Sequence, residues 1–215
     1  MKHITFHLDF ISPYACLAFG QLPQALEGIS YSIDYKPLLF AALLKHQGQL
    51  GPAEIAPKRE WTYRHVMWLA DKLGVKMRMP ATHPFNPLPL LRLAMACGSN
   101  AGDTNRSVCE QIFRYVWTSG ADMADAAHFE KLAAHLKPRH DLQSDVIKNC
   151  LRANTQAAIQ KGIFGVPTFE VDDKIFWGLD ALPMLRDYLL GEPWFAGDAW
   201  HDASRVAVGA TRVKP

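Results

Sequence analysis

The stretch LDFISPYACLA, residues 8–18, decides how this chain begins to fold. Apolar residues up to Asp9 alternate as in a strand, whereas the residues after Ser12 and Pro13 are typical of a helix. Serine before proline favours a helix start, because the serine side chain caps free backbone N–H groups and proline fits the first helical position. We therefore predict that Ser12 lies at a strand-to-helix junction.

The sequence around this stretch predicts a β-α-β unit. HITFHLDF, residues 3–10, alternates with Ile4, Phe6 and Leu8 on one face, and ISYSIDYKPL, residues 29–38, alternates again after the helix. Two strands joined by a helix usually pair in parallel through a crossover connection. We expect a parallel pair of strands at the start of the chain.

Strand patterns disappear over the middle of the chain and return near its end. Apolar residues recur at helical spacing from about residue 55 to 161, and we expect residues from about 46 to 162 to be mainly helical. PTFEVDDKIFWG, residues 167–178, then predicts a hairpin with its turn at Asp172 and Asp173. A last helix is expected after it, with Asp180 as its N-cap and Gly191 as its C-terminal stop.

The overall composition is that of an ordinary globular protein. The chain has 215 residues, of which 49% are hydrophobic and 20% charged, and its formal net charge is +2. The sequence has no sustained basic run, so we do not expect nucleic acid as a partner. It also has no apolar run of membrane-spanning length and no secretory pattern, so we expect a cytoplasmic protein that does not bind membranes.

Cysteine and histidine spacing argues against disulfides and metal binding. The four cysteines are scattered without a C-x-x-C pair, and the nine histidines form no H-E-x-x-H motif. We expect reduced thiols and no metal site.

Three motifs together resemble a known family. FISPYACLA (residues 10–18), FGVPTFEV (164–171) and FWGLDAL (176–182) are similar to segments of the 2-hydroxychromene-2-carboxylate isomerases and of the related kappa-class glutathione transferases. The resemblance spans residues 3 to about 190 and implies an α/β fold, a thioredoxin-like fold of the DsbA type with a large inserted all-helical domain. The expected units are a discontinuous thioredoxin-like domain (1–45 and 163–195), the inserted domain (46–162) and a C-terminal tail (196–215).

The resemblance gives Ser12 a catalytic role. Thioredoxin-like oxidoreductases carry a C-x-x-C pair at this helix start, and Ser12 and Ala15 stand at its two cysteine positions, so dithiol chemistry is excluded here. The implied cofactor is glutathione, whose thiolate Ser12 would hydrogen-bond. Without the resemblance, a plain helix cap remains the simpler interpretation of Ser12.

The resemblance also implies further binding residues. The residues expected to hold glutathione are Ser12, Pro13, Val166, Pro167, Leu179 and Asp180. The bond between Val166 and Pro167 is expected to be cis, so that the Val166 backbone pairs with a peptide ligand. The candidate contacts for a small aromatic carboxylate substrate are Lys58, Trp61, Phe85, Asn86 and Arg92. His65 stands at a position that is usually acidic in relatives.

The implied activity is a glutathione-dependent isomerisation in the catabolism of aromatic compounds. It would interconvert 2-hydroxychromene-2-carboxylate and trans-o-hydroxybenzylidenepyruvate, or a close analogue, with glutathione recovered unchanged. Two alternatives stay open: a kappa-like glutathione transferase acting on small electrophiles, and a non-catalytic or thiol-redox protein of the same fold. Members of this family are commonly dimers, so a homodimer is expected.

Overall fold

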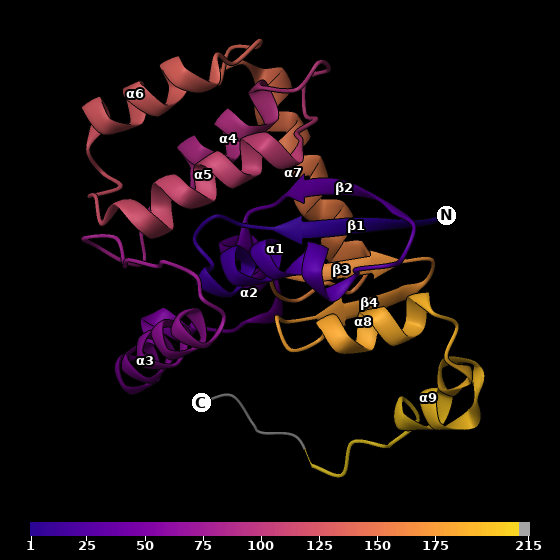
Figure 1. Ribbon diagram of the computed structural model, residues 1–215. Coiled ribbons are helices and arrows are strands. Elements are labelled where there is room, and N and C mark those ends of the chain that lie inside the picture. The colour runs from indigo at the N-terminus through magenta and orange to yellow at the C-terminus, as the bar shows by residue number, and fades with distance from the viewer. Residues whose placement is uncertain (211–215) are drawn as a thin grey trace.

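A four-stranded mixed sheet joins the two ends of the chain. The computed structural model describes residues 1–210 (Figure 1). The strands are β1 (Lys2–Leu8), β2 (Tyr31–Pro37), β3 (Thr168–Val171) and β4 (Lys174–Trp177). Their order is β2-β1-β3-β4, with β1 parallel to β2 and the other two pairs antiparallel. The predicted parallel pair and the predicted hairpin are both confirmed.

The segment between β2 and β3 is helical, as the sequence predicts. Its helices are α2 (Phe40–Gln47), the short 3-10 helix η1 (Pro52–Glu54), α3 (Ala56–Lys72), α4 (Leu88–Ala96), α5 (Arg106–Ser119), α6 (Ala126–Leu136) and α7 (Asp145–Gln160). Figure 1 shows α4, α5 and α6 gathered beyond the β2 edge of the sheet and α3 standing apart from them. The other helices are α1 (Pro13–Ala25), α8 (Leu182–Leu189), η2 (Pro193–Ala196) and α9 (Asp198–Ala203). Across residues 1–210, no helix has the apolar length needed to cross a lipid bilayer.

One apolar core connects the sheet with the helical segment. Ile4, Phe6 and Leu8 are fully buried, as the alternation of β1 predicts. They belong to the same cluster of buried side chains as Leu91 of α4 and Trp117 of α5. The two expected parts share this core, so the core does not mark a boundary between them. The division into a thioredoxin-like domain and an inserted helical domain stays a prediction.

The start of α8 differs from the prediction. Asp180 does not cap this helix, because α8 begins at Leu182 with Ala181 as N-cap and no side-chain cap bond. The chain turns at Gly178, which has φ +106°, and backbone bonds from Ala181 and Leu182 close the turn instead. Asp180 is thereby left exposed beside the turn. Gly191 follows the end of α8 with φ +84°, as predicted for a helix stop.

The predicted C-terminal tail, residues 196–215, contains a short helix. Phe195, at the end of η2, is buried against Phe176 and Tyr188, with ring centroids 6.1 and 5.2 Å away. Trp200 of α9 packs on Phe195 at 5.5 Å. Aromatic contacts thus attach the first part of the predicted tail to β4 and α8, and residues 211–215 lie outside the described residues.

Truncating Phe6 should destabilise the fold strongly. Its fully buried ring lies 4.6 Å from the Phe169 ring and 6.3 Å from the Phe19 ring, so Phe6→Ala leaves a cavity between the sheet and α1. We expect a loss of about 3–5 kcal/mol in the free energy of unfolding, measured by urea denaturation. Phe164→Ala is the matched control, because Phe164 is 40% exposed. Equal losses in both variants would contradict this packing.

Candidate functional site

Ser12 connects the first two of the three sequence motifs. It is the N-cap of α1, and its Oγ accepts the Ala15 N–H at 3.2 Å, so the predicted cap is confirmed. The same hydroxyl donates to the Val166 carbonyl at 3.4 Å. Because this second bond is long, the hydroxyl is only weakly held by Val166. Ser12 can therefore redirect its proton to an acceptor that enters beside Val166.

A buried carboxyl group holds the turn that leads into Ser12. Asp9 is fully buried, and its carboxylate accepts the N–H groups of Ile11 at 3.2 Å and Phe40 at 2.9 Å. The Asp9 backbone carbonyl accepts the Ser12 N–H at 3.1 Å. Burial raises the pKa of Asp9 to about 7, although its backbone hydrogen bonds act in the opposite direction. The sequence gives no sign of this role, since the Asp9 partners are backbone groups.

The helical segment also reaches the turn before Ser12. Trp117 of α5 donates from Nε1 to the Phe10 carbonyl at 3.0 Å. His83, between α3 and α4, contacts the Ile11 carbonyl through Nε2 at 2.9 Å. The carbonyls of Phe10 and Ile11 are thus held by side chains far away in the sequence.

The second and third motifs meet next to this turn. The Val166–Pro167 bond is cis, as predicted, and the His83–Pro84 bond is also cis, which was not predicted from the sequence. The Pro167 carbonyl accepts the Gly178 N–H at 3.0 Å. This bond joins the loop before β3 to the loop after β4, where Leu179 and Asp180 lie.

A cleft of about 900 Å³ lies beside these loops, between α1, α3 and α8. Among the predicted site residues, it is lined by Val166, Pro167, Leu179 and Asp180. Ser12 and Pro13 are not in its lining: they are buried at its edge, and Ser12 is connected to it through Val166. Four of the six predicted glutathione-binding residues therefore face a single cavity.

The cleft is also lined by residues that the sequence motifs do not point to. They are Tyr14, Gln21, Gln24 and Ala25 of α1; His65, Leu69, Lys72 and the adjacent Leu73 on the α3 side; and Trp177, Gly178, Leu182, Pro183 and Arg186. The Tyr14 hydroxyl lies 2.9 Å from His65 Nδ1. Burial, and to a lesser extent the charge of Asp180, raise the pKa of Tyr14, so its hydroxyl stays protonated at neutral pH. The amphipathic spacing of Tyr14 in α1 was the only available signal, and it also fits a core position.

The five predicted substrate contacts lie outside the cleft lining. Lys58 and Trp61 are exposed on α3, and the Trp61 ring stacks on His65 with centroids 6.1 Å apart. The side chains of the other three have partners of their own: Phe85 packs on His83, Asn86 accepts the Leu88 N–H, and Arg92 donates to Gln143. The structure thus does not bring these five residues together.

Cys16 is not a candidate nucleophile. It follows Ala15 in α1, and burial raises the pKa of its thiol to about 12. A thiol with this pKa carries almost no reactive thiolate at neutral pH. All four cysteines are free thiols, as expected.

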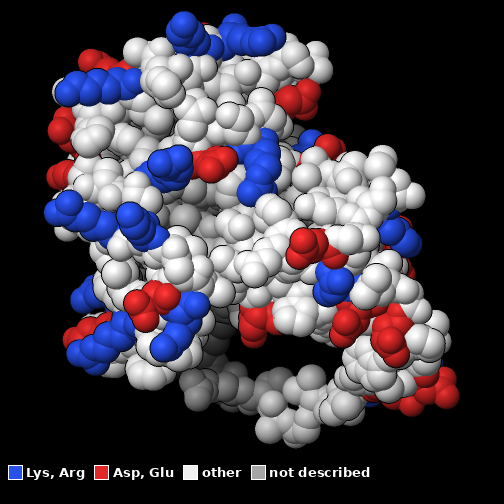
Figure 2. Space-filling model, viewed as in Figure 1, with Lys and Arg blue, Asp and Glu red and all other residues white. Residues whose placement is uncertain are grey.

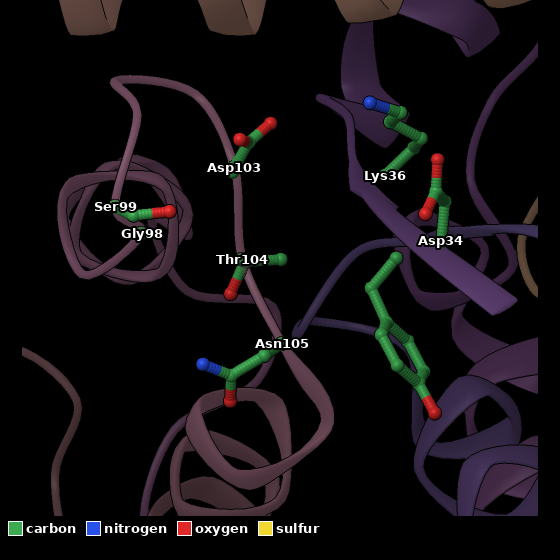
Figure 3. A pocket seen from close by; sticks show the side chains of 8 residues that line it. Asp34, Lys36, Gly98, Ser99, Asp103, Thr104 and Asn105 are labelled. Atoms are coloured by element: carbon green, nitrogen blue, oxygen red, sulfur yellow. The ribbon is translucent and has the colours of Figure 1, made fainter.

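A second, smaller hollow of about 370 Å³ lies at the β2 edge of the sheet. Figure 3 shows Asp34 and Lys36 projecting from β2 beside the loop that carries Asp103 and Thr104. This lining mixes charges of both signs, and the face shown in Figure 2 likewise mixes basic and acidic side chains. None of the predicted site residues lines this hollow, so the cleft next to Ser12 is the better candidate.

The arrangement of sheet, helical segment and cis-proline loop matches a known family. The model of the DSBA-like thioredoxin domain matches residues 3–190. This chain belongs to the DSBA-like thioredoxin family. The family fold, with a mixed sheet and many helices, agrees with the fold expected from the sequence.

Two kinds of name recur among the relatives of this chain. The chain is 28% identical over 197 residues to a 2-hydroxychromene-2-carboxylate isomerase of Sphingobium xenophagum, covering 88% of this chain and 98% of that protein. It is 25% identical over 203 residues to glutathione S-transferase kappa 1 of Rattus norvegicus, covering 86% and 89%. A solved 2-hydroxychromene-2-carboxylate isomerase has the same fold, with a TM-score of 0.73 at 22% identity, covering 95% and 100% of the two chains.

Asp9 should make the stability of the protein depend on pH. Its pKa is raised from 3.8 to about 7, so between these values the folded chain keeps a proton that the unfolded chain has lost. The stability contributed by Asp9 is therefore largest below its unfolded pKa and falls as the pH rises toward 7, by at most about 1.4 kcal/mol per pH unit. Asp9→Asn, which cannot ionise, should remove this slope. Urea unfolding between about pH 5 and pH 7 measures how the free energy of unfolding changes with pH. The same pH dependence in Asp9→Asn as in the wild type would contradict the role given to Asp9.

Proposed function

We propose that the protein is a glutathione-dependent isomerase that interconverts 2-hydroxychromene-2-carboxylate and trans-o-hydroxybenzylidenepyruvate, or a close analogue. The observation that carries this proposal is the contact of the Ser12 hydroxyl with the Val166 carbonyl at the edge of the cleft. The names of the related isomerases support the type of reaction. We further propose that the protein works in the cytoplasm, in agreement with its four free cysteines.

The residues at the cleft fit glutathione, a tripeptide with a thiol in its middle residue. Ser12 supplies a hydroxyl donor beside the N-terminus of α1, where the helix dipole favours a negative charge. Val166 supplies a backbone carbonyl for the peptide N–H of the ligand, and Asp180 a carboxylate for its ammonium group. When bound, glutathione supplies a nucleophilic thiolate that adds reversibly to conjugated carbon.

The residues around Ser12 favour binding and orientation of a thiolate. Pro13 starts α1 without an N–H group of its own, and no acidic side chain occupies the first turn of this helix. A thiolate beside Ser12 therefore meets no repelling carboxylate from that turn. Tyr14 of α1 also lines the cleft and provides a neutral hydroxyl, while Lys72 and Arg186 provide positive charge for a substrate carboxylate.

We keep Lys58, Trp61, Phe85, Asn86 and Arg92 as proposed substrate contacts. Phe85 is the best supported of these, because its ring packs on His83, which itself contacts the turn before Ser12. Binding of substrate analogues to alanine variants at these five positions tests the proposal.

A kappa-like glutathione transferase is the second candidate function. It is favoured by relatives named kappa glutathione transferase at 25% identity, and it uses the same activated thiol. Product analysis separates the two. An isomerase returns glutathione unchanged, whereas a transferase leaves glutathione covalently bound to the electrophile.

Replacing Ser12 by alanine should impair thiolate formation more than glutathione binding. One hydrogen bond to a charged group is worth about 1.5–3 kcal/mol, so we expect a higher pKa of the bound thiol and roughly a tenfold to hundredfold slower isomerisation at neutral pH. Ultraviolet absorbance of the thiolate and stopped-flow kinetics measure these changes.

Because Ser12 also caps α1, the stability of each variant has to be measured alongside. Ser12→Asn is the control, since asparagine keeps a good cap but alters the contact to sulfur. If Ser12→Ala loses about 1 kcal/mol of stability yet keeps full activity and an unchanged thiol titration, Ser12 is only a cap.

We also propose that the protein is a homodimer. Trp61 and Trp68 of α3 are 66% and 55% exposed, which is unusual for large aromatic side chains and fits an interface. Light scattering at micromolar concentration should give twice the chain mass of 24.1 kDa. A molar mass equal to that of one chain would exclude the dimer.

A further inference from the structure

We propose that His83 is a positioning residue for Ser12, acting through the peptide group between Ile11 and Ser12. The inference rests on the proposed function in one respect, which is that Ser12 meets the bound sulfur. His83 itself is assigned no contact with ligand or substrate. Its role follows from the hydrogen bonds that fix this peptide group.

The Ile11–Ser12 peptide group is held at both of its polar ends. Its carbonyl accepts a hydrogen bond from His83 Nε2 at 2.9 Å, and its N–H donates to the Asp9 carbonyl at 3.1 Å. Because a peptide group is planar, fixing both ends fixes its orientation. The Ser12 Cα follows directly, so the direction of the Ser12 side chain depends on this plane.

Hydrogen-bond chemistry defines the protonation of the His83 ring. A carbonyl oxygen can only accept, so Nε2 carries the hydrogen. Burial lowers the pKa of His83, so the ring is neutral at pH 7 and Nδ1 has a free lone pair. The Tyr63 hydroxyl of α3 lies 2.7 Å from this Nδ1 and 2.8 Å from the His83 carbonyl. Burial raises the pKa of Tyr63, so its hydroxyl keeps the proton that it shares between these two acceptors.

The ring of His83 is also fixed by its aromatic neighbours. Phe85 and Tyr63 meet it edge to face, with centroids 5.9 and 5.4 Å away, and Trp117 lies at 5.6 Å. A chain of contacts thus runs from Tyr63 on α3 through His83 to the peptide group before Ser12. The helical segment therefore helps to orient the proposed catalytic hydroxyl.

Loss of the His83 donor frees one end of this peptide group. Ser12 Oγ keeps its bonds to the Ala15 N–H and the Val166 carbonyl, but its position relative to a bound sulfur is less precisely fixed, so the thiolate loses part of its stabilisation. We expect His83→Leu to raise the pKa of the thiol of bound glutathione. It should also lower kcat about tenfold, which corresponds to the loss of one neutral hydrogen bond. The KM for glutathione should change much less, because the binding groups along the cleft remain.

Two further variants separate positioning from general stability. His83→Gln keeps a side-chain donor, so it should restore most of kcat. Thr82→Val is the matched control: Thr82 is exposed, precedes His83 in the same loop, and bonds only to Asp122 among the described hydrogen bonds. It should leave both the thiol pKa and kcat at the wild-type values.

A measurement on the protein without ligand tests the positioning directly. Hydrogen exchange of the Ser12 amide, followed by NMR, should be about tenfold faster in His83→Leu and unchanged in Thr82→Val. Tyr63→Phe removes the support of Nδ1 and should accelerate exchange to a smaller extent, so it serves as the second variant if His83→Leu does not fold.

The outcomes for the two proposals differ. If the wild-type protein does not bind glutathione, the proposed function fails, and the Ser12 exchange rate still decides the role of His83. If Ser12 exchange is unchanged in His83→Leu, or in Tyr63→Phe where His83→Leu does not fold, the positioning role is wrong whatever the activity shows. Faster exchange at Ser12, together with rescue by His83→Gln, supports it.

Discussion

The antiparallel pairing of β1 with β3 is the constraint on which the rest of the structure depends. It sets Phe6 opposite Phe169 and His7 opposite Thr168, so the chain that leaves β1 and the chain that enters β3 are neighbours. Ser12 and Val166 meet for this reason, although 154 residues separate them in the sequence. The cleft, the cis-proline loop and the first helix all take their relative positions from this pairing.

The helical segment has a second role besides forming part of the core. Trp117 and His83 each contact a carbonyl of the turn before Ser12, and the buried Asp9 carboxylate links the same turn to the first residue of α2. Polar contacts of this kind are directional, whereas apolar packing is not. The core attaches the helices to the sheet, and these few hydrogen bonds orient the turn.

Local patterns in the sequence predicted the elements well, and long-range contacts limited the rest. The cap at Ser12, the hairpin turn at Asp172 and the stop at Gly191 depend on neighbouring residues, so the sequence was sufficient. Asp180 was misassigned because the turn at Gly178 closes through backbone bonds that no residue type signals. The contacts of His83 and Trp117 were missed for a similar reason, since their partners are distant carbonyls.

The sheet order has a consequence for synthesis of the protein. The first strand, helix and second strand leave the ribosome long before β3, which must then pair with β1 on the side opposite β2. At about 5–20 residues per second, the chain takes roughly 8–30 seconds to grow by the 154 positions from Ser12 to Val166. During this time one edge of β1 has no neighbouring strand, so the nascent chain has to shield it, by the growing helical segment or by a chaperone.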